Sequence, residues 1–262
     1  MARQSLNLGW TFPRLALPDR IRAAACVGFR YVECHFPYEH DAAELAGVLR
    51  ETGLAMVAMN VPRGGEGRLG LASVAGADAA FREDLVRALD WSRILEAPFV
   101  HVLAGDLGPE PRAAAEARLA ENLAWAATEA GTETTLLVEP LNSHDRPDYL
   151  LSRIDQAARI IGEVGRPNVR LLFDAYHVAM MEDDPVAQLA RHAGIIAHVQ
   201  VAGVPGHHEP DEGIVDYEAF YDALDRTGYA GLIGAEYVPR GDTLAGLAWL
   251  GELGIVGRET LA

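Results

Sequence analysis

Lysine is absent from this sequence. All 22 basic residues are arginines, and they face 38 Asp and Glu, so the formal net charge is −16. Without a lysine amine, Schiff-base catalysis by the chain is excluded. A strongly anionic protein repels phosphate backbones at long range, which argues against nucleic-acid binding.

Cysteine and long apolar runs are also scarce. The two cysteines, Cys26 and Cys34, form no CxxC motif and fit a reduced, cytoplasmic protein without a disulfide framework. The first residues, MARQSLNLGWTF, lack the apolar core of a signal peptide. No run approaches the ~20 apolar residues that span a bilayer. We therefore expect a cytoplasmic protein that does not associate with membranes.

Short apolar runs alternate with longer amphipathic stretches along the chain. The runs, each rich in Val, Ile, Leu or aromatic residues, predict strands at Ser5–Leu8, Tyr31–Cys34, Ala55–Met59, Phe99–Leu103, Thr135–Val138, Val169–Phe173, Ala197–Val201 and Leu232–Ala235. The stretches between them predict helices at 17–28, 41–53, 77–95, 111–130, 152–164, 185–192, 217–227 and 243–253. In the second of these, Asp41 is the expected N-cap and Gly53 the expected stop.

This order predicts one (β/α)8 TIM barrel, a single domain over residues 1–262. Roughly eight β-then-α units in a chain of about this length are typical of that fold. The main alternative, an open doubly wound sheet, usually has fewer strands and often a glycine-rich turn after the first. The sequence after Leu8, GWTFPRLALP, contains no GxGxxG motif.

Polar residues stand where several predicted strands end. They are Glu33 or His35, Asn60, His101, Glu139, Asp174, Gln200 and Glu236. A TIM barrel carries its active site at the carboxyl ends of its strands. The last four residues come from four consecutive strands and would form an arc around half the mouth. A single glutamate at a strand end often only caps a helix or pairs with an arginine. Four polar residues at the ends of four consecutive strands are harder to explain that way.

Three carboxylates and an amide oxygen at close quarters repel one another unless a cation lies among them. Oxygen ligands suit Mg²⁺ or Mn²⁺ better than Zn²⁺. We therefore expect Glu139, Asp174, Gln200 and Glu236 to bind a divalent metal ion. Of the histidines, His177 and His101 are candidates for substrate binding, with His101 evenly balanced against a core role. His198, one layer below Gln200, is expected to be structural.

The sequence resembles the hydroxypyruvate isomerase family, within the xylose-isomerase-like TIM barrels. The similarity covers nearly the whole chain and lies in the segments HFPYEHDAAEL, HVLAG, VEPLN, GRPNVRLLFDAYH, HVQVAGVPG, HEP and EYVPRGDTLAGLAWL. It implies that Glu139, Asp174, Gln200 and Glu236 hold Mg²⁺ or Mn²⁺. It also implies that Glu139 and Glu236 move the proton and that His177 binds substrate. Members are often oligomers, so a homo-oligomer is left open.

The segment PGHHEPDEGI departs from the family pattern PGRHEPGTGE. His207 replaces an arginine, Asp211 and Glu212 replace small residues, and Ile214 replaces a glutamate; Gly203 also replaces a usual aspartate. These loops should face the substrate. Because histidine cannot clamp a carboxylate with two parallel hydrogen bonds as arginine does, we expect His207 to contact substrate and hydroxypyruvate to be used poorly.

The predicted reaction interconverts the aldehyde and ketone forms of a small hydroxy-carbonyl substrate. A proton passes between adjacent carbons through an enediolate, with a divalent cation as Lewis acid. Hydroxypyruvate, a 2-oxo sugar acid or a ketose would fit, and Asn60 and His207 are further candidates for binding it. A ketose 3-epimerase, a 2-oxo-sugar-acid isomerase and an inosose-type dehydratase remain alternatives.

Two classes outside this chemistry are disfavoured. An abasic-site endonuclease would need zinc-binding histidines and a basic face, whereas the pI is about 4.9 and Gln200 occupies a ligand position. A non-catalytic sugar-binding barrel would not need the pair Glu139 and Glu236.

Overall fold

The computed structural model describes residues 4–181 and 183–252. Within these residues, eight parallel strands close into a barrel in chain order, with β1 paired to both β2 and β8. The strands are β1 (Gln4–Asn7), β2 (Tyr31–Cys34), β3 (Ala55–Asn60), β4 (Phe99–His101), β5 (Thr135–Val138), β6 (Val169–Asp174), β7 (Ile196–Val201) and β8 (Ile233–Ala235). The predicted (β/α)8 barrel is confirmed.

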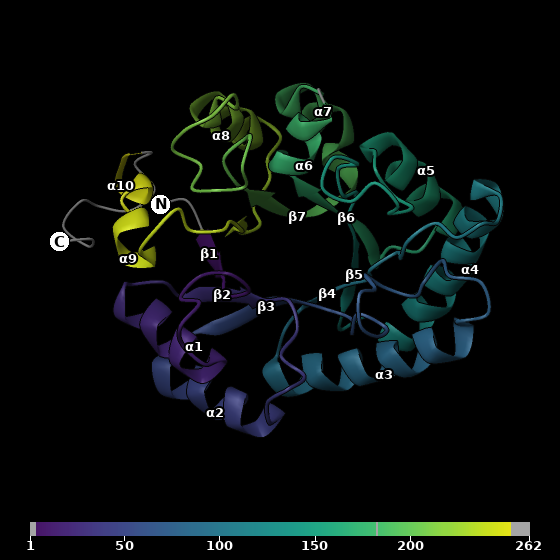
Figure 1. Cartoon of the computed structure of the whole chain (residues 1–262), viewed down its shortest axis with the longest axis horizontal. Helices are drawn as coiled ribbons and strands as arrows, with labels where there is room; N and C mark the ends of the chain where they lie inside the picture. Colours follow the sequence, from purple (N-terminus) through teal and green to yellow (C-terminus); the bar gives the residue numbers. More distant parts are fainter. Residues whose placement is uncertain (1–3, 182, 253–262) are drawn as a thin grey trace.

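Helices surround the barrel (Figure 1). In the described part of the chain they are α1 (Leu17–Cys26), α2 (Ala42–Thr52), α3 (Asp78–Leu95), α4 (Arg112–Ala130), α5 (Ile154–Val164), α6 (Ala175–Met180), α7 (Pro185–His192), α8 (Tyr217–Arg226), α9 (Thr243–Gly246) and α10 (Trp249–Glu252). None of these described helices combines the length and the apolar character that a membrane crossing requires.

Local sequence explains the limits of α2. Asp41 is its N-cap, and the Asp41 carboxylate accepts a 2.8 Å hydrogen bond from the backbone N–H of Glu44. Gly53 ends the helix in the left-handed conformation, with φ of 69°, which glycine adopts without the steric cost of a Cβ. Both roles were predicted from the sequence, and both are confirmed.

Two helical regions differ from the sequence prediction. Helix α6 begins directly after β6 and was missed, because six residues are too few to show a helical period. Near the C-terminus, the predicted helix 243–253 is instead two short helices, α9 and α10, separated by a turn at Leu247. With this turn, Leu247, Trp249 and Leu250 are all buried. Leu253 lies outside the described residues.

The barrel interior directly under the mouth is polar. The Glu33 carboxylate is almost fully buried and accepts hydrogen bonds from Ser5, from His198 Nε2 at 2.9 Å and from Gln200 Nε2 at 2.8 Å. Gly234 makes room for it, since a Cβ at that position would lie 2.4 Å from Glu33 Oε1. Glu33 is therefore a buried support under the site, and His198 has the structural place predicted for it.

Candidate active site

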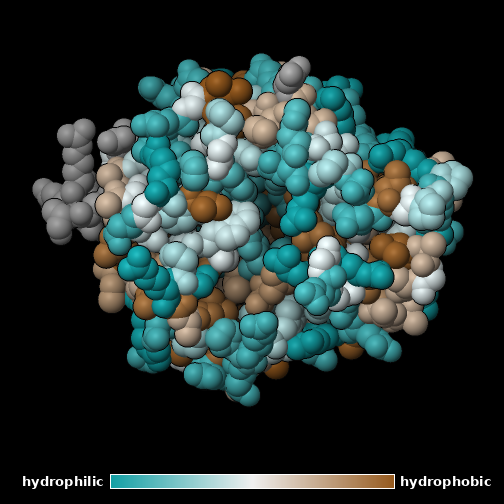
Figure 2. Space-filling model, viewed as in Figure 1, coloured by the Kyte–Doolittle hydropathy of each residue, from teal (hydrophilic) through white to brown (hydrophobic). Residues whose placement is uncertain are grey.

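A cavity of about 420 Å³ lies at the carboxyl ends of the strands. In Figure 2 the face shown is mostly hydrophilic and is hollowed near its middle. Six of the residues singled out from the sequence line the cavity: Asn60, His101, Glu139, His177, His207 and Glu236. His35 also lines it, so the choice between Glu33 and His35 is resolved by depth, with His35 at the cavity and Glu33 below.

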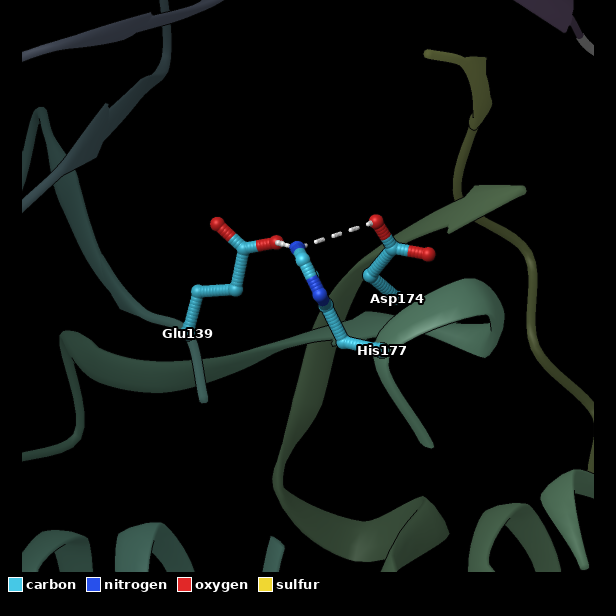
Figure 3. Close-up of side chains that lie close together, drawn as sticks. All are labelled: Glu139, Asp174 and His177. Carbon is cyan, nitrogen blue, oxygen red and sulfur yellow. Dashed lines mark ion pairs between the residues drawn. The ribbon is translucent and has the colours of Figure 1, made fainter. Parts of the chain in front are cut away.

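Glu139, Asp174 and His177 form a compact group (Figure 3), in which Glu139 and His177 line the cavity and the buried Asp174 does not. Glu139 directly follows β5, Asp174 ends β6, and His177 lies on α6, which follows β6 without a loop. His177 Nε2 lies 3.8 Å from Glu139 Oε1 and 3.9 Å from Asp174 Oδ2. Among the His, Cys, Asp and Glu side chains of the described residues, this is the group with the spacing of a metal site.

The hydrogen bonds of His177 set its tautomer. Its Nδ1 accepts from the Asn142 backbone N–H at 3.2 Å and faces Asn142 Nδ2 at 2.8 Å. Burial, followed by the nearby His207, lowers the pKa of His177 to about 3, so the ring is neutral at pH 7. A neutral ring that accepts at Nδ1 carries its proton on Nε2. His177 therefore presents an N–H donor to the site, with the two nearest carboxylate oxygens at 3.8 and 3.9 Å, and this suits substrate binding better than metal ligation.

Two buried oxygens in the site have no hydrogen-bond donor among the described residues: Asp174 Oδ2 and Gln200 Oε1. Asp174 and Gln200 are paired in register on β6 and β7, so their side chains share one end of the barrel. The other atoms of both groups are bonded, because Asp174 Oδ1 caps α6 at Tyr176 N and Gln200 Nε2 donates to Glu33 and Glu236. Buried unpaired oxygens beside a second carboxylate fit a divalent cation that prefers oxygen ligands.

Glu236 has a different environment. Its Oε2 accepts a 2.7 Å hydrogen bond from Asn7 Nδ2 and another from Gln200 Nε2, and its Oε1 lies 2.9 Å from His35 Nε2. Gly9 gives His35 its space, since a Cβ at Gly9 would lie 2.2 Å from the His35 ring. Glu236 is thus held by partners from β1, the end of β2 and β7.

These surroundings move the pKa values of the carboxyl groups in opposite directions. Burial, together with the charges of Glu236 and Asp174, raises the pKa of Glu139 well above its usual range. Burial and the charge of Glu236 do the same to the pKa of Asp174. Burial alone would also raise the pKa of Glu236, but His35 outweighs it and lowers that pKa to about 2. In turn the Glu236 charge outweighs burial at His35 and raises the pKa of that histidine.

The other predicted substrate contacts lie around the cavity wall. His101 ends β4, is buried, and places Nδ1 3.4 Å from Glu139 Oε2. Asn60 ends β3, and its backbone carbonyl accepts a hydrogen bond from the Tyr38 hydroxyl. His207 stacks on Tyr176, with ring centroids 4.1 Å apart and planes 10° apart. Its buried Nε2 has no protein partner among the described residues, so it is available to a substrate.

Sequence reasoning missed several residues of the site. Asn7 holds Glu236, and the cavity wall also includes Trp10, Arg63, Asp145, Arg146 and Tyr176. Asn7 ends β1, so the rule applied to the other strands could have found it. The rest lie on loops or on the unpredicted helix α6, where the chain shows no period from which to place them.

The expectation that the loop after β7 faces the substrate is wrong for three of its positions. Asp211, Glu212 and Ile214 are not among the described residues that line the cavity. Asp211 and Glu212 instead form ion pairs with Arg240, the second at 2.7 Å, and Ile214 is 74% exposed. Their carboxylates are therefore held by an arginine that follows β8 and also pairs with Glu209, instead of facing a substrate.

Comparisons with known proteins agree with this geometry. Residues 21–253 match the model of the xylose isomerase-like TIM barrel, and the chain belongs to that family. It is 42% identical to the 2-oxo-tetronate isomerase of Cupriavidus necator, over 95% of this chain and 98% of that protein. It is 34% identical to the hydroxypyruvate isomerase of Escherichia coli, over 95% and 98%. The resemblance read from the sequence motifs is confirmed.

A solved structure of similar shape is described as an AP endonuclease of family 2 from Brucella melitensis. It has a TM-score of 0.93 and 36% identity, and the match covers 96% of this chain and 99% of that one.

Proposed function

We propose that this protein is a metal-dependent isomerase of small hydroxy acids that carry a 2-oxo group. The reaction exchanges the carbonyl group with the hydroxyl group on the adjacent carbon. The observation that carries the proposal is the presence of Glu139 and Glu236 in one cavity, beside the unpaired oxygens of Asp174 and Gln200. The activities named for the relatives, 2-oxo-tetronate isomerase and hydroxypyruvate isomerase, belong to this reaction class.

Glu139, Asp174, Gln200 and Glu236 would hold the cation, with Mg²⁺ or Mn²⁺ favoured by a set made of oxygen atoms. A bound divalent cation supplies the positive charge that stabilises negative charge developing on the substrate's carbonyl and hydroxyl oxygens. The neutral His177, which carries its proton on Nε2, would donate a hydrogen bond to one of these oxygens.

The two glutamates would move the proton. One carboxylate removes the hydrogen of the hydroxyl-bearing carbon as a proton, and the electron pair of that C–H bond forms the carbon–carbon double bond of an enediolate. A proton is then delivered to the former carbonyl carbon, while the hydroxyl proton passes to the former carbonyl oxygen. Glu139 follows β5 and Glu236 follows β8, so they reach the cavity from different sides of the barrel.

An endonuclease is a second candidate because the Brucella melitensis structure is described as an AP endonuclease of family 2. Its chemistry on a DNA backbone would suit a cluster of zinc-binding histidines and a basic surface. Here the metal-spaced group of the described residues contains one histidine, and the sequence carries a net charge of −16. The isomerase is therefore the better match to this site.

The test is a substrate screen by NMR with Mg²⁺ or Mn²⁺ over hydroxypyruvate, 2-oxo-tetronate and neutral ketoses. We expect a positional isomer to form from a 2-oxo acid. Formation of only a stereoisomer would instead identify an epimerase, and cleavage of an abasic oligonucleotide without isomerisation would contradict the proposal. We also propose a cytoplasmic location, which the free thiols of Cys26 and Cys34 support.

A further inference from the structure

Two arginines converge on the rim of the cavity from separate loops. Arg63 lies in the loop after β3, and Arg146 lies in the loop after β5; both line the cavity and both are exposed. The backbone of each is tied down, since the Arg63 carbonyl accepts a hydrogen bond from Gly70 N at 2.9 Å and Arg146 N donates to Asn142 O at 3.0 Å.

Neither guanidinium has a carboxylate partner within the described chain, whereas Glu236 on the same cavity is paired with His35. The Arg63 guanidinium lies over the Phe36 ring, 4.2 Å from its centroid. Asp145 also lines the cavity, but its Oδ2 accepts from Tyr176 Oη at 2.7 Å and from Asn142 Nδ2 at 2.8 Å. Thus Asp145, the acidic residue next to Arg146 in the chain, is already engaged by neutral donors.

The two positive charges also act on each other. Burial, followed by the charge of Arg146, lowers the pKa of Arg63. Two like charges that face one cavity repel, and an anion placed between them relieves that repulsion. Guanidinium groups bind carboxylates with paired, charge-assisted hydrogen bonds.

We propose that Arg63 and Arg146 together bind the carboxylate of the substrate and select 2-oxo acids over neutral ketoses of the same length. This inference rests on the proposed isomerase function and names the substrate class of the same site. It also accounts for the loss of the arginine at position 207: in this chain the carboxylate is held by a pair on two other loops, and His207 is free to contact the hydroxyl end.

The proposal is tested with two substrates that differ only at this group. 2-oxo-tetronate carries a carboxylate where erythrulose carries a hydroxymethyl group, so the ratio of their kcat/KM values isolates the carboxylate. For Arg63→Gln and Arg146→Gln we expect that ratio to fall about tenfold each, and about a hundredfold in the double variant, mainly through KM for the acid. Arg68→Gln is the matched control, because Arg68 lies in the same loop as Arg63, is exposed and does not line the cavity.

A binding measurement separates this proposal from the proposed function. Glycerate retains a carboxylate but lacks the 2-oxo group, and glycerol lacks both. Glycerate should raise the Tm of the native protein and of Arg68→Gln, and should have little effect on the double variant; glycerol should have none on any of them. If glycerate binding depends on the two arginines but no substrate is turned over, the role of the arginine pair is supported and the isomerase function is rejected. An unchanged selectivity ratio, or equal binding of glycerate by the double variant, would overturn the arginine pair.

Discussion

The two sides of the site bury carboxylates in environments that shift their pKa values in opposite directions. On the side of β8, β1 and β2, Glu236 accepts hydrogen bonds from Asn7 and Gln200 and pairs with His35, and its pKa falls to about 2. On the side of β5 and β6, Glu139 and Asp174 approach each other around a neutral His177, and both pKa values rise. The barrel thus compensates the charge of Glu236 with its own groups even before a cation binds, whereas Glu139 and Asp174 depend on protons or a cation.

Of the changes that test this difference between the two sides, removal of divalent metal should have the largest effect on turnover. Without a cation, only protonation relieves the repulsion on the β5–β6 side, and no Lewis acid stabilises the enediolate, so we expect turnover to fall below detection after chelation and to return with Mn²⁺ or Mg²⁺. Activity is measured after dialysis against chelator, with metal content checked by elemental analysis. Undiminished turnover in a preparation verified as metal-free would break the comparison, because the β5–β6 side would then need no cation.

The next largest effect should come from the two glutamates. Glu139→Gln and Glu236→Gln each keep an oxygen atom and remove the group that carries the proton, so kcat should fall by about 10²–10⁴. Glu129→Gln, an exposed change on α4, serves as the control.

In D₂O the native enzyme should place deuterium on the carbon that receives the proton. If both glutamine variants kept near-native rates, or if the product lacked solvent deuterium at a non-exchanging position, the proton would not travel through these carboxylates.

His35→Asn should shift the pH dependence of activity by a smaller amount. The ion pair with His35 is what overcomes burial at Glu236, so its removal should raise the Glu236 pKa from about 2. The acid limb of the pH–rate profile should move to higher pH by at least about one unit. His192→Asn is the control, since His192 pairs with Asp155 on the outer surface. An acid limb that stays in place in His35→Asn would show that His35 does not set the charge of Glu236.

The smallest expected effect is on stability. Because the folded-state pKa values of Glu139 and Asp174 are raised, the metal-free protein holds protons that the unfolded chain releases above about pH 4. Their contribution to the free energy of unfolding therefore declines as pH rises from that value towards the folded-state pKa. A cation competes with these protons, so its stabilisation should grow with pH.

We expect the rise in Tm on adding Mn²⁺ to be a few degrees larger at pH 8 than at pH 6. Asp174→Asn should reduce both the rise and its pH dependence, and Glu129→Gln should reduce neither. A rise in Tm that is the same at both pH values would contradict the assignment of the raised pKa values to the metal side.

The barrel and the strand-end positions of four polar residues could be predicted from the sequence because each depends on local pattern. Alternating apolar runs and amphipathic helices define the β/α order, and a closed parallel barrel brings all carboxyl strand ends to one mouth. Asp174 and Gln200 therefore fall in register on β6 and β7 once the strands are located. The resemblance to a known family added the roles proposed for them, which strand position alone does not supply.

Other features depended on contacts between segments far apart in the chain. Depth in the barrel separated Glu33 from His35, and the Asn142 loop decided which nitrogen of His177 carries the proton. Arg240, which follows β8, draws Asp211 and Glu212 away from the cavity, while two loops bring Arg63 and Arg146 to it. Strands and helices repeat a backbone geometry that leaves a period in the sequence, whereas a loop takes its path from the surfaces it packs against, and only the folded chain creates those surfaces.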